Sequence, residues 1–207
     1  MLRLILVRHG RTAWNVLGRV QGGGALDDVG RAQASALAER LSGERISVVY
    51  SSPALRARQT AAAVAERLRL PVRRSMLLRD LDYGRFAGAL VTDVQEQEPG
   101  LLERWRASPH TVRFEGGDSI ADLRARIARF IARTARAHDD TTVLAATHDS
   151  PVRVAASIAL GLDDSQHTRE GLRTKLASVT ELRVDGEVME LPVHNEVGHL
   201  QGIDGDA

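Results

Sequence analysis

The sequence contains no cysteine, which excludes disulfides, thiolate chemistry and cysteine–zinc sites. Its 207 residues include no run of about 18 apolar residues, so no membrane-spanning helix is predicted. Arg8 and His9 interrupt the apolar N-terminal segment, so we expect no signal peptide and a cytoplasmic location. Because the formal net charge is only +1, binding to nucleic acid or to a membrane surface is not expected.

Hydrophobic residues make up 43% of the chain, which is ordinary for a globular protein with a core. Short aliphatic segments alternate with segments of helical periodicity. Strands are predicted at 2–7, 47–50, near Val72 and at 141–147, with a hairpin of 177–183 and 187–191 around Asp185-Gly186. Helices are predicted at 28–42, 54–68, 91–107, from a cap at Asp118 or Ser119 to about Ala137, and at 151–160. This alternation predicts one α/β domain with a mostly parallel sheet.

Two histidines follow buried strands directly. The run "LILV" ends at Arg8-His9-Gly10, and the strand at 141–147 ends at Thr147-His148. Ligands of such sheets bind beyond the carboxyl ends of the strands. We therefore expect the two histidines to meet across one crevice.

Three further stretches carry polar residues suited to the same crevice: "SSPALRARQTA" (51–61), "LRDLDYGRFAG" (78–88) and "ATHDSPVR" (146–153). Arginines, histidines and a carboxylate together suit a phosphate ester. A guanidinium matches phosphate oxygens bidentately, and nearby arginines help to keep a nucleophilic imidazole neutral. A carboxylic acid can protonate the departing alkoxide.

The stretch "LVRHGRTAWN" resembles the signature of the histidine phosphatase superfamily, whose fold is phosphoglycerate mutase-like. The three later stretches resemble further motifs of that family, in the same order, so the resemblance covers residues 2 to about 183. It implies a single-domain three-layer α/β/α sandwich over residues 1–195, with a mostly parallel, mixed central sheet. Residues 196–207 are polar and rich in glycine, and we expect them to form a flexible C-terminal tail.

The resemblance also implies a role for each matching residue. His9 would be the nucleophile and become phosphohistidine, while Arg8 and Arg56 would clamp the phosphoryl group. His148 would hydrogen-bond a phosphoryl oxygen, and Asp80 would be the proton donor. No metal or other cofactor would be required.

Substrate-facing residues are implied as well. Thr12 and Asn15 would lie beside the pocket, and Gln21 and Gly22 would belong to a loop that faces the substrate. Asp149 stands where the family often has glycine. Its carboxylate could repel phosphate, or it could bind a cationic or hydroxylated substrate.

Other departures concern the proton donor. Many family members have glutamate where Asp80 stands, and Asp82 is a second candidate because an extended segment would place it on the same face. Phe86 and Ala87 replace a tryptophan and a glutamate that the family often shows.

Several alternatives remain open at this point. His148-Asp149 could belong to a metal site, but no persuasive set of further ligands is present. Arg58 and the helical stripe Arg126, Arg129, Arg133 and Arg136 are expected to be solvated.

The favoured function is a metal-independent phosphatase that hydrolyses a small-molecule phosphate monoester. The alternatives are a cofactor-dependent phosphoglycerate mutase and a catalytically weak binding or regulatory family member. A protein phosphohistidine phosphatase is less favoured, because residues 108–118 could cover the site. A homodimer is compatible with the sequence.

Overall fold

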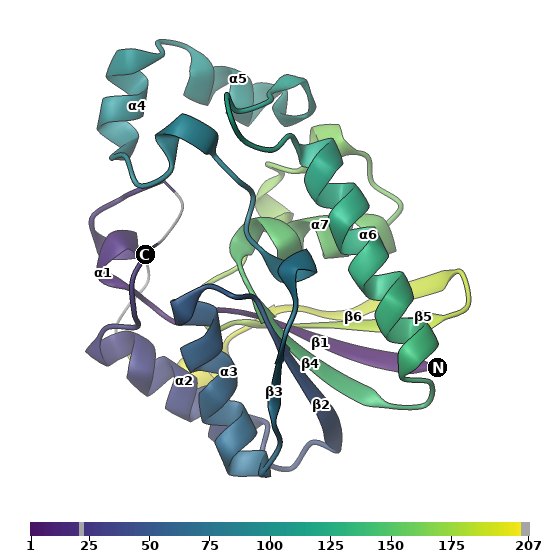
Figure 1. Ribbon diagram of the computed structural model, residues 1–207. Helices are drawn as coiled ribbons and strands as arrows, with labels where there is room; N and C mark the ends of the chain where they lie inside the picture. The colour runs from purple at the N-terminus through teal and green to yellow at the C-terminus, as the bar shows by residue number, and fades with distance from the viewer. Residues whose placement is uncertain (21–22, 204–207) are drawn as a thin grey trace.

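The computed structural model describes residues 1–20 and 23–203, and these residues form one layered α/β unit (Figure 1). Its sheet has the strand order β3-β2-β4-β1-β5-β6. The strands are β1 (Leu2–Arg8), β2 (Ile46–Ser51), β3 (Val72–Arg74), β4 (Thr142–Thr147), β5 (Val179–Asp185) and β6 (Val188–Glu196). The first four are mutually parallel, and β5 and β6 form an antiparallel hairpin at one edge. The predicted mixed, mostly parallel sheet is confirmed.

Helices cover both faces of this sheet. They are α1 (Ala13–Val16), α2 (Asp28–Arg40), α3 (Leu55–Leu68), α4 (Val91–Gln97), α5 (Leu101–Ala107), α6 (Ile120–Ala137) and α7 (Asp149–Ala159). Strand β1 has apolar side chains on both faces, so a layer of helices is needed on each side of the sheet to bury them. Leu4 and Leu6 pack in a core cluster with α6 and α7, whereas Ile5 and Val7 pack in a second cluster with α2 and α3.

The centre of the sheet sets the position of the two histidines. Strands β1 and β4 are neighbours, and their register pairs Arg8 with Thr147, the last residue of each strand. The backbone N–H of His9 donates to the carbonyl of Thr147 at 3.0 Å. His9 and His148 therefore leave the sheet side by side.

The structure differs from the sequence-based expectation at several element ends. The single helix predicted for 91–107 is wrong: α4 and α5 are separated at Pro99-Gly100, where Gly100 has φ 86°. Helix α7 begins at Asp149 rather than at 151, and β6 runs on to Glu196. In Figure 1, α4 and α5 lie at the top, apart from the sheet.

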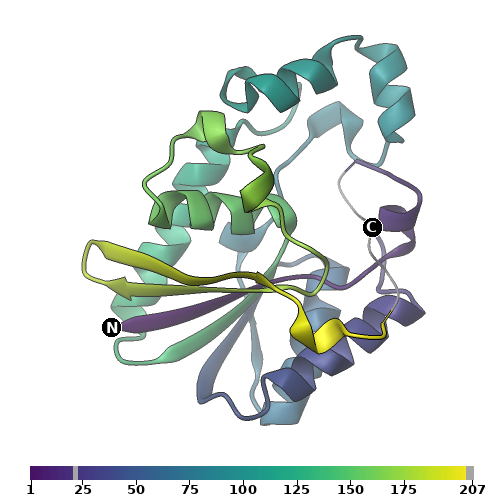
Figure 2. The same cartoon turned by 180° about the vertical axis from the view of Figure 1, so that it is seen from behind.

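The C-terminal segment was expected to be a flexible tail from residue 196. Residues 198–200 form the short helix η6 (Gly198–Leu200), which lies beside α2 (Figure 2). The ring of His199 is only 4% exposed and its Nε2 lies 3.2 Å from the carbonyl oxygen of Ala177. The part of this segment around His199 is therefore packed against the domain.

In residues 1–20 and 23–203, no helix combines the length and the apolar character needed to cross a lipid bilayer.

Candidate active site

His9 is held in one neutral tautomer. Its Nε2 accepts a hydrogen bond from Nε of Arg56 at 3.0 Å, because a guanidinium can only donate. Its Nδ1 therefore carries the proton and donates to the carbonyl of Gly10 at 2.8 Å. Burial lowers the pKa of His9 well below its usual value, and the charges of Arg56 and Arg8 lower it further. The lone pair that a nucleophile needs is thus on Nε2.

The glycine that follows serves a close approach of two backbone segments. A Cβ at Gly10 would lie 2.6 Å from the carbonyl oxygen of Gly30 in α2. The N–H of Gly10 donates to Oγ1 of Thr60 in α3 at 3.1 Å. These contacts bind the residues after His9 to both helices on that face of the sheet.

His148 accepts a hydrogen bond from the same guanidinium as His9. Its Nδ1 accepts from Nη2 of Arg56 at 2.9 Å, so Nε2 carries the proton and donates to Oγ of Ser52 at 2.8 Å. The rings of His9 and His148 lie edge to face with centroids 5.2 Å apart. Burial, followed by the charge of Arg56, lowers the pKa of His148 well below its usual value.

Two arginines supply positive charge to the site. Arg56 lies in the first turn of α3, whose N-terminus has no side-chain cap and carries partial positive charge. Arg8 donates through Nη1 to the carbonyl of Thr174, and its Nε has no hydrogen-bond partner among the described residues. That free donor can bind a phosphoryl oxygen.

Asp80 lies beside both Arg56 and His148. Its Oδ2 is 3.6 Å from Nη2 of Arg56 and 3.7 Å from Nδ1 of His148. Its Oδ1 accepts from the N–H of Leu81 at 2.9 Å, and 12% of the side chain is exposed. Burial raises the pKa of Asp80 to about 6, although Arg56 and the bond from Leu81 oppose the rise. A carboxyl group with this pKa can both donate and accept a proton near neutrality.

Asp82 has a different environment. Its Oδ1 accepts from the N–H of Gly84 at 2.9 Å, at the start of the short helix η2 (Gly84–Phe86). Gly84 itself approaches the backbone of residue 115, where a Cβ would lie 1.9 Å from the carbonyl oxygen. The contacts of Asp82 therefore shape a turn, and the geometry favours Asp80 as the acid.

Asp149 is a paired carboxylate. Its Oδ2 lies 2.7 Å from Nη2 of Arg153, and its Oδ1 accepts from the N–H and Oγ1 of Thr174 at 3.2 and 2.8 Å. Burial alone would raise the pKa of Asp149, but Arg153, Arg8 and the hydrogen bonds outweigh burial and lower it. The sequence left open whether the carboxylate of Asp149 repels phosphate, and in the structure its negative charge is balanced by Arg153.

The remaining predicted site residues divide into two groups. Thr12 and Asn15 bond to each other: Oδ1 of Asn15 accepts from the N–H and Oγ1 of Thr12 at 3.0 and 2.9 Å. These contacts form a capping box at α1, which orders the loop after His9. Gln21 and Gly22 lie outside the described residues.

Two supporting residues were not identified from the sequence. Ser52 stands in a motif that was noted, but its bond to His148 depends on the fold. Arg126 was expected to be solvated, and that is wrong: 13% of its side chain is exposed, and it contacts the loop that carries Asp80. A sequence signal existed, because Arg126 lies three residues after Leu123 and four before Phe130, at the edge of the buried helix face.

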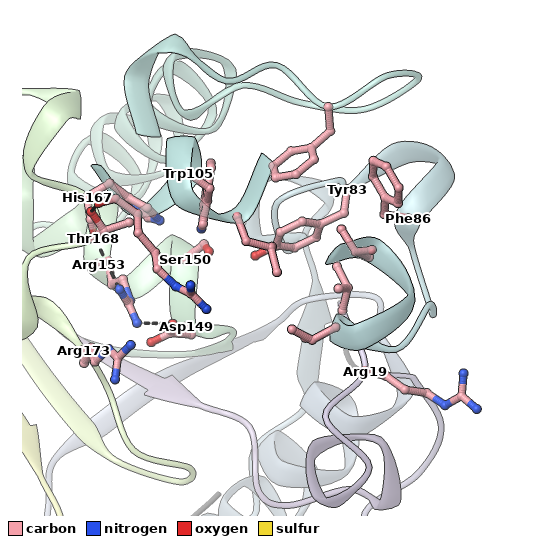
Figure 3. A pocket seen from close by; sticks show the side chains of 16 residues that line it. Arg19, Tyr83, Phe86, Trp105, Asp149, Ser150, Arg153, His167, Thr168 and Arg173 are labelled. Atoms are coloured by element: carbon pink, nitrogen blue, oxygen red, sulfur yellow. Dashed lines mark hydrogen bonds and ion pairs between the residues drawn. The ribbon is translucent and has the colours of Figure 1, made fainter. Parts of the chain in front are cut away.

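The described residues enclose a cavity of about 550 Å³, and Figure 3 shows its lining. Tyr83 lines it together with Asp149 and Ser150, the two residues that follow His148 in the chain, whereas His9, Arg56 and His148 themselves do not. Aromatic rings of Tyr83, Trp105 and Phe114 pack together on one wall, with centroids 4.8 to 6.3 Å apart. Arg153, Arg173 and His167 gather at one end, on the same side as Asp149, while Arg19 lies on the opposite side (Figure 3).

Two buried polar atoms at the cationic end lack hydrogen-bond partners among the described residues. They are Nε of Arg153 and Nδ1 of His167. Burial lowers the pKa of His167 to about 4, so its ring is neutral at physiological pH. Among residues 1–20 and 23–203, no group of three or more histidine or acidic side chains is placed to hold a metal ion.

Two neutral histidines joined by one guanidinium, with a protonatable carboxyl group beside them, define a phosphoryl-transfer site. Comparison with known proteins agrees. The family model of the histidine phosphatase superfamily (branch 1) matches residues 4–197, and the chain belongs to this superfamily. It is a phosphoric monoester hydrolase of the histidine phosphatase type.

The relatives include phosphatases with a named substrate. The chain is 38% identical over 168 residues to phosphoserine phosphatase 1 of Hydrogenobacter thermophilus, a match that covers 80% of each chain. It is 32% identical to a metal-independent phosphoserine phosphatase of Arabidopsis thaliana, over 99% of this chain and 88% of the relative. Among solved structures, Bacillus stearothermophilus YhfR superposes with a TM-score of 0.92 at 26% identity, over 97% of this chain and 100% of that one.

Proposed function

We propose that the enzyme hydrolyses its substrate in two steps through a phosphohistidine at His9. The supporting observation is the bridge that Arg56 makes between His9 and His148 in their neutral forms, with Asp80 at 3.6 Å from the same guanidinium. First, Nε2 of His9 attacks phosphorus while the bond from phosphorus to the ester oxygen breaks. Asp80 gives its proton to that oxygen, which leaves as an alcohol.

In the second step, water attacks the phosphorus of phosphohistidine and Asp80 takes a proton from the water. The phosphorus–nitrogen bond breaks, inorganic phosphate leaves, and His9 and Asp80 return to their starting forms. Arg56 and the free Nε of Arg8 would bind the equatorial oxygens, where charge is spread in the transition state. Catalysis then rests on positioning and electrostatic stabilisation, and no step requires a metal ion.

We further propose that the substrate is a phosphorylated carboxylic acid that also carries an ammonium group, such as phosphoserine. Arg153 and Arg173 at the cationic end of the cavity suit a carboxylate, and the unpartnered Nε of Arg153 is a free donor. Asp149, which is 28% exposed on the same side, suits the ammonium group. Two relatives are named phosphoserine phosphatases, which agrees with this choice.

The test is a steady-state assay in chelator with phosphoserine, 3-phosphoglycerate and glycerol 3-phosphate. Wild type should prefer phosphoserine, and His9→Ala should lose turnover of every ester. Arg58→Ala is the matched control, because Arg58 is exposed on the same helix as Arg56. Arg173→Ala should raise KM for phosphoserine and leave KM for glycerol 3-phosphate unchanged. Loss of wild-type activity in chelator, or turnover by His9→Ala, would overturn the mechanism.

Phosphohistidine can be observed directly. Mixing the enzyme with ³²P-labelled phosphoserine and quenching in alkali should leave label on the protein, and brief acid should release it. The same reaction with His9→Ala should leave none. Interconversion of 2- and 3-phosphoglycerate only when 2,3-bisphosphoglycerate is added would instead indicate a mutase. Silence on every ester would indicate a binding member of the family.

A cytoplasmic location and a homodimer stay predictions. Light scattering during size-exclusion chromatography would determine the oligomeric state.

A further inference from the structure

One partly buried arginine outside the proposed phosphoryl-binding groups contacts the loop that carries Asp80. Arg126 projects from α6, and its Nη1 donates to the carbonyls of Leu77, at 3.3 Å, and Arg79. Its Nη2 donates to the carbonyl of Asp80 at 2.9 Å and to Oδ2 of Asp118 at 3.1 Å. A single guanidinium thus binds three carbonyls of residues 77–80.

Asp118 makes hydrogen bonds to the backbone on the C-terminal side of Asp80, at Asp82. The N–H of Asp82 donates to Oδ2 of Asp118 at 3.3 Å, and the N–H of Asp118 donates to the carbonyl of Asp82 at 2.8 Å. Arg126 and Asp118 together therefore fix the backbone immediately before and after Asp80. A further bond, from Oγ1 of Thr147 to the carbonyl of Leu78 at 2.8 Å, fastens the loop to the end of β4.

We propose that Arg126 is a positioning residue for the proton donor, an inference that rests on the proposed role of Asp80. Arg126 acts on the backbone of Asp80, while the carboxyl group of Asp80 points to Arg56 and His148. The function of Arg126 is to keep the carboxyl group of Asp80 within reach of the departing oxygen. A shift of about 1 Å in a catalytic group can cost up to about 100-fold in rate.

The physical reason for an arginine at this place is the number of acceptors. Three carbonyl oxygens and one carboxylate converge within reach of one side chain, and only a guanidinium offers enough donors in a fixed plane. Removing it would leave these acceptors without their shared donor, and the loop could then adopt other positions.

The dependence on the leaving group tests this role. An alkyl phosphate needs a proton on its departing oxygen, whereas 4-nitrophenyl phosphate releases a stable anion. For Arg126→Gln, kcat/KM with phosphoserine should fall about 10- to 100-fold. With 4-nitrophenyl phosphate, kcat/KM should fall less than about 3-fold. This parameter reports only the steps up to formation of phosphohistidine, and in those steps the 4-nitrophenolate leaves without needing a proton. Asp80→Asn should show the same selectivity with a larger fall.

Controls separate positioning from loss of folding. Arg129→Gln, an exposed arginine on the same helix, should match wild type on both esters. Partial unfolding would lower the rates on both esters equally, so the ratio of the two kcat/KM values is independent of the folded fraction. Arg126→Lys, which keeps the charge but loses the planar donor set, should give an intermediate ratio.

The double variant Asp80→Asn with Arg126→Gln provides an independent check. If Arg126 acts through Asp80, the double variant should lose no more on phosphoserine than Asp80→Asn alone. An unchanged ratio in Arg126→Gln, beside a changed ratio in Asp80→Asn, would overturn the role of Arg126 only. An unchanged ratio in Asp80→Asn would overturn the proposed role of Asp80 as the proton donor, on which the role of Arg126 rests, while hydrolysis through His9 is tested separately by His9→Ala.

Discussion

Asp80, in the loop after β3, and Asp149, at the start of α7, are two partly buried acids near His148 with opposite pKa shifts. The pKa of Asp80 rises to about 6, while the pKa of Asp149 falls below its usual value. Both are partly buried, and desolvation by itself raises both pKa values. The difference therefore lies in their partners.

Asp149 has a cation at 2.7 Å and two hydrogen bonds from Thr174, which together outweigh the cost of burying its charge. Asp80 has one backbone donor, and its cation, Arg56, lies at 3.6 Å and is shared with two histidines. An acid with one hydrogen bond and a distant, shared cation keeps a raised pKa and can exchange a proton near neutral pH. A close cation together with two hydrogen bonds keeps the other acid ionised.

The largest expected effect is on catalysis by Asp80. Asp80→Asn keeps the shape but removes the proton, so kcat/KM for phosphoserine should fall by about 10² to 10⁴. Asp149→Asn should act on phosphoserine mainly through KM, because Asp149 holds no transferable proton at neutral pH. Steady-state kinetics of both variants measure the contrast. Equal losses in kcat for the two variants would mean that the two acids share one role.

The next effect is on stability through Asp149. Asp149→Asn leaves Arg153 without its counter-ion, so the free energy of unfolding at pH 7 should fall by about 2 to 4 kcal/mol. Because the pKa of Asp149 is lowered in the folded state, its stabilisation is present above about pH 4 and is lost as the pH falls through the folded value. Urea unfolding of Asp149→Asn and wild type measures this difference in the free energy of unfolding. The difference should be smaller in acid than at pH 7.

Asp80 should show the opposite sign. Between about pH 4 and pH 6, the folded state binds more protons at Asp80 than the unfolded state, so this group lowers stability as the pH rises through that window. Asp80→Asn should therefore be more stable than wild type at pH 7 by about 1 to 2 kcal/mol. The gain should fade toward pH 4. A variant less stable than wild type at pH 7 would contradict the raised pKa.

The smallest effect concerns Asp82, two residues from Asp80. Asp82→Asn keeps an oxygen that can accept from the N–H of Gly84, so the turn should persist. We expect kcat/KM to change less than about 3-fold on either ester, since general acid catalysis, worth 10² to 10⁴, is not removed. A loss on phosphoserine alone in Asp82→Asn, with no such loss in Asp80→Asn, would make Asp82 the proton donor.

Much of the architecture follows from local sequence patterns. Apolar runs that stop at Arg8-His9 and Thr147-His148 identify strand ends, and the strand–helix alternation predicts the layers that the structure confirms. These signals span a few residues each, and backbone propensity and periodicity act over the same short range. The break between α4 and α5 was missed, although Pro99-Gly100 marks it.

The division of work among the charged residues was decided only by tertiary structure. Arg126 lies 46 residues from Asp80 along the chain, and Thr174 lies 25 residues from Asp149. The sequence shows that these side chains are charged or polar, but not which of them meet or how deeply they are buried. A pKa depends on burial and on partners a few ångströms away in space, so only the folded chain distinguishes an acid with a raised pKa, such as Asp80, from an ion-paired acid with a lowered pKa, such as Asp149.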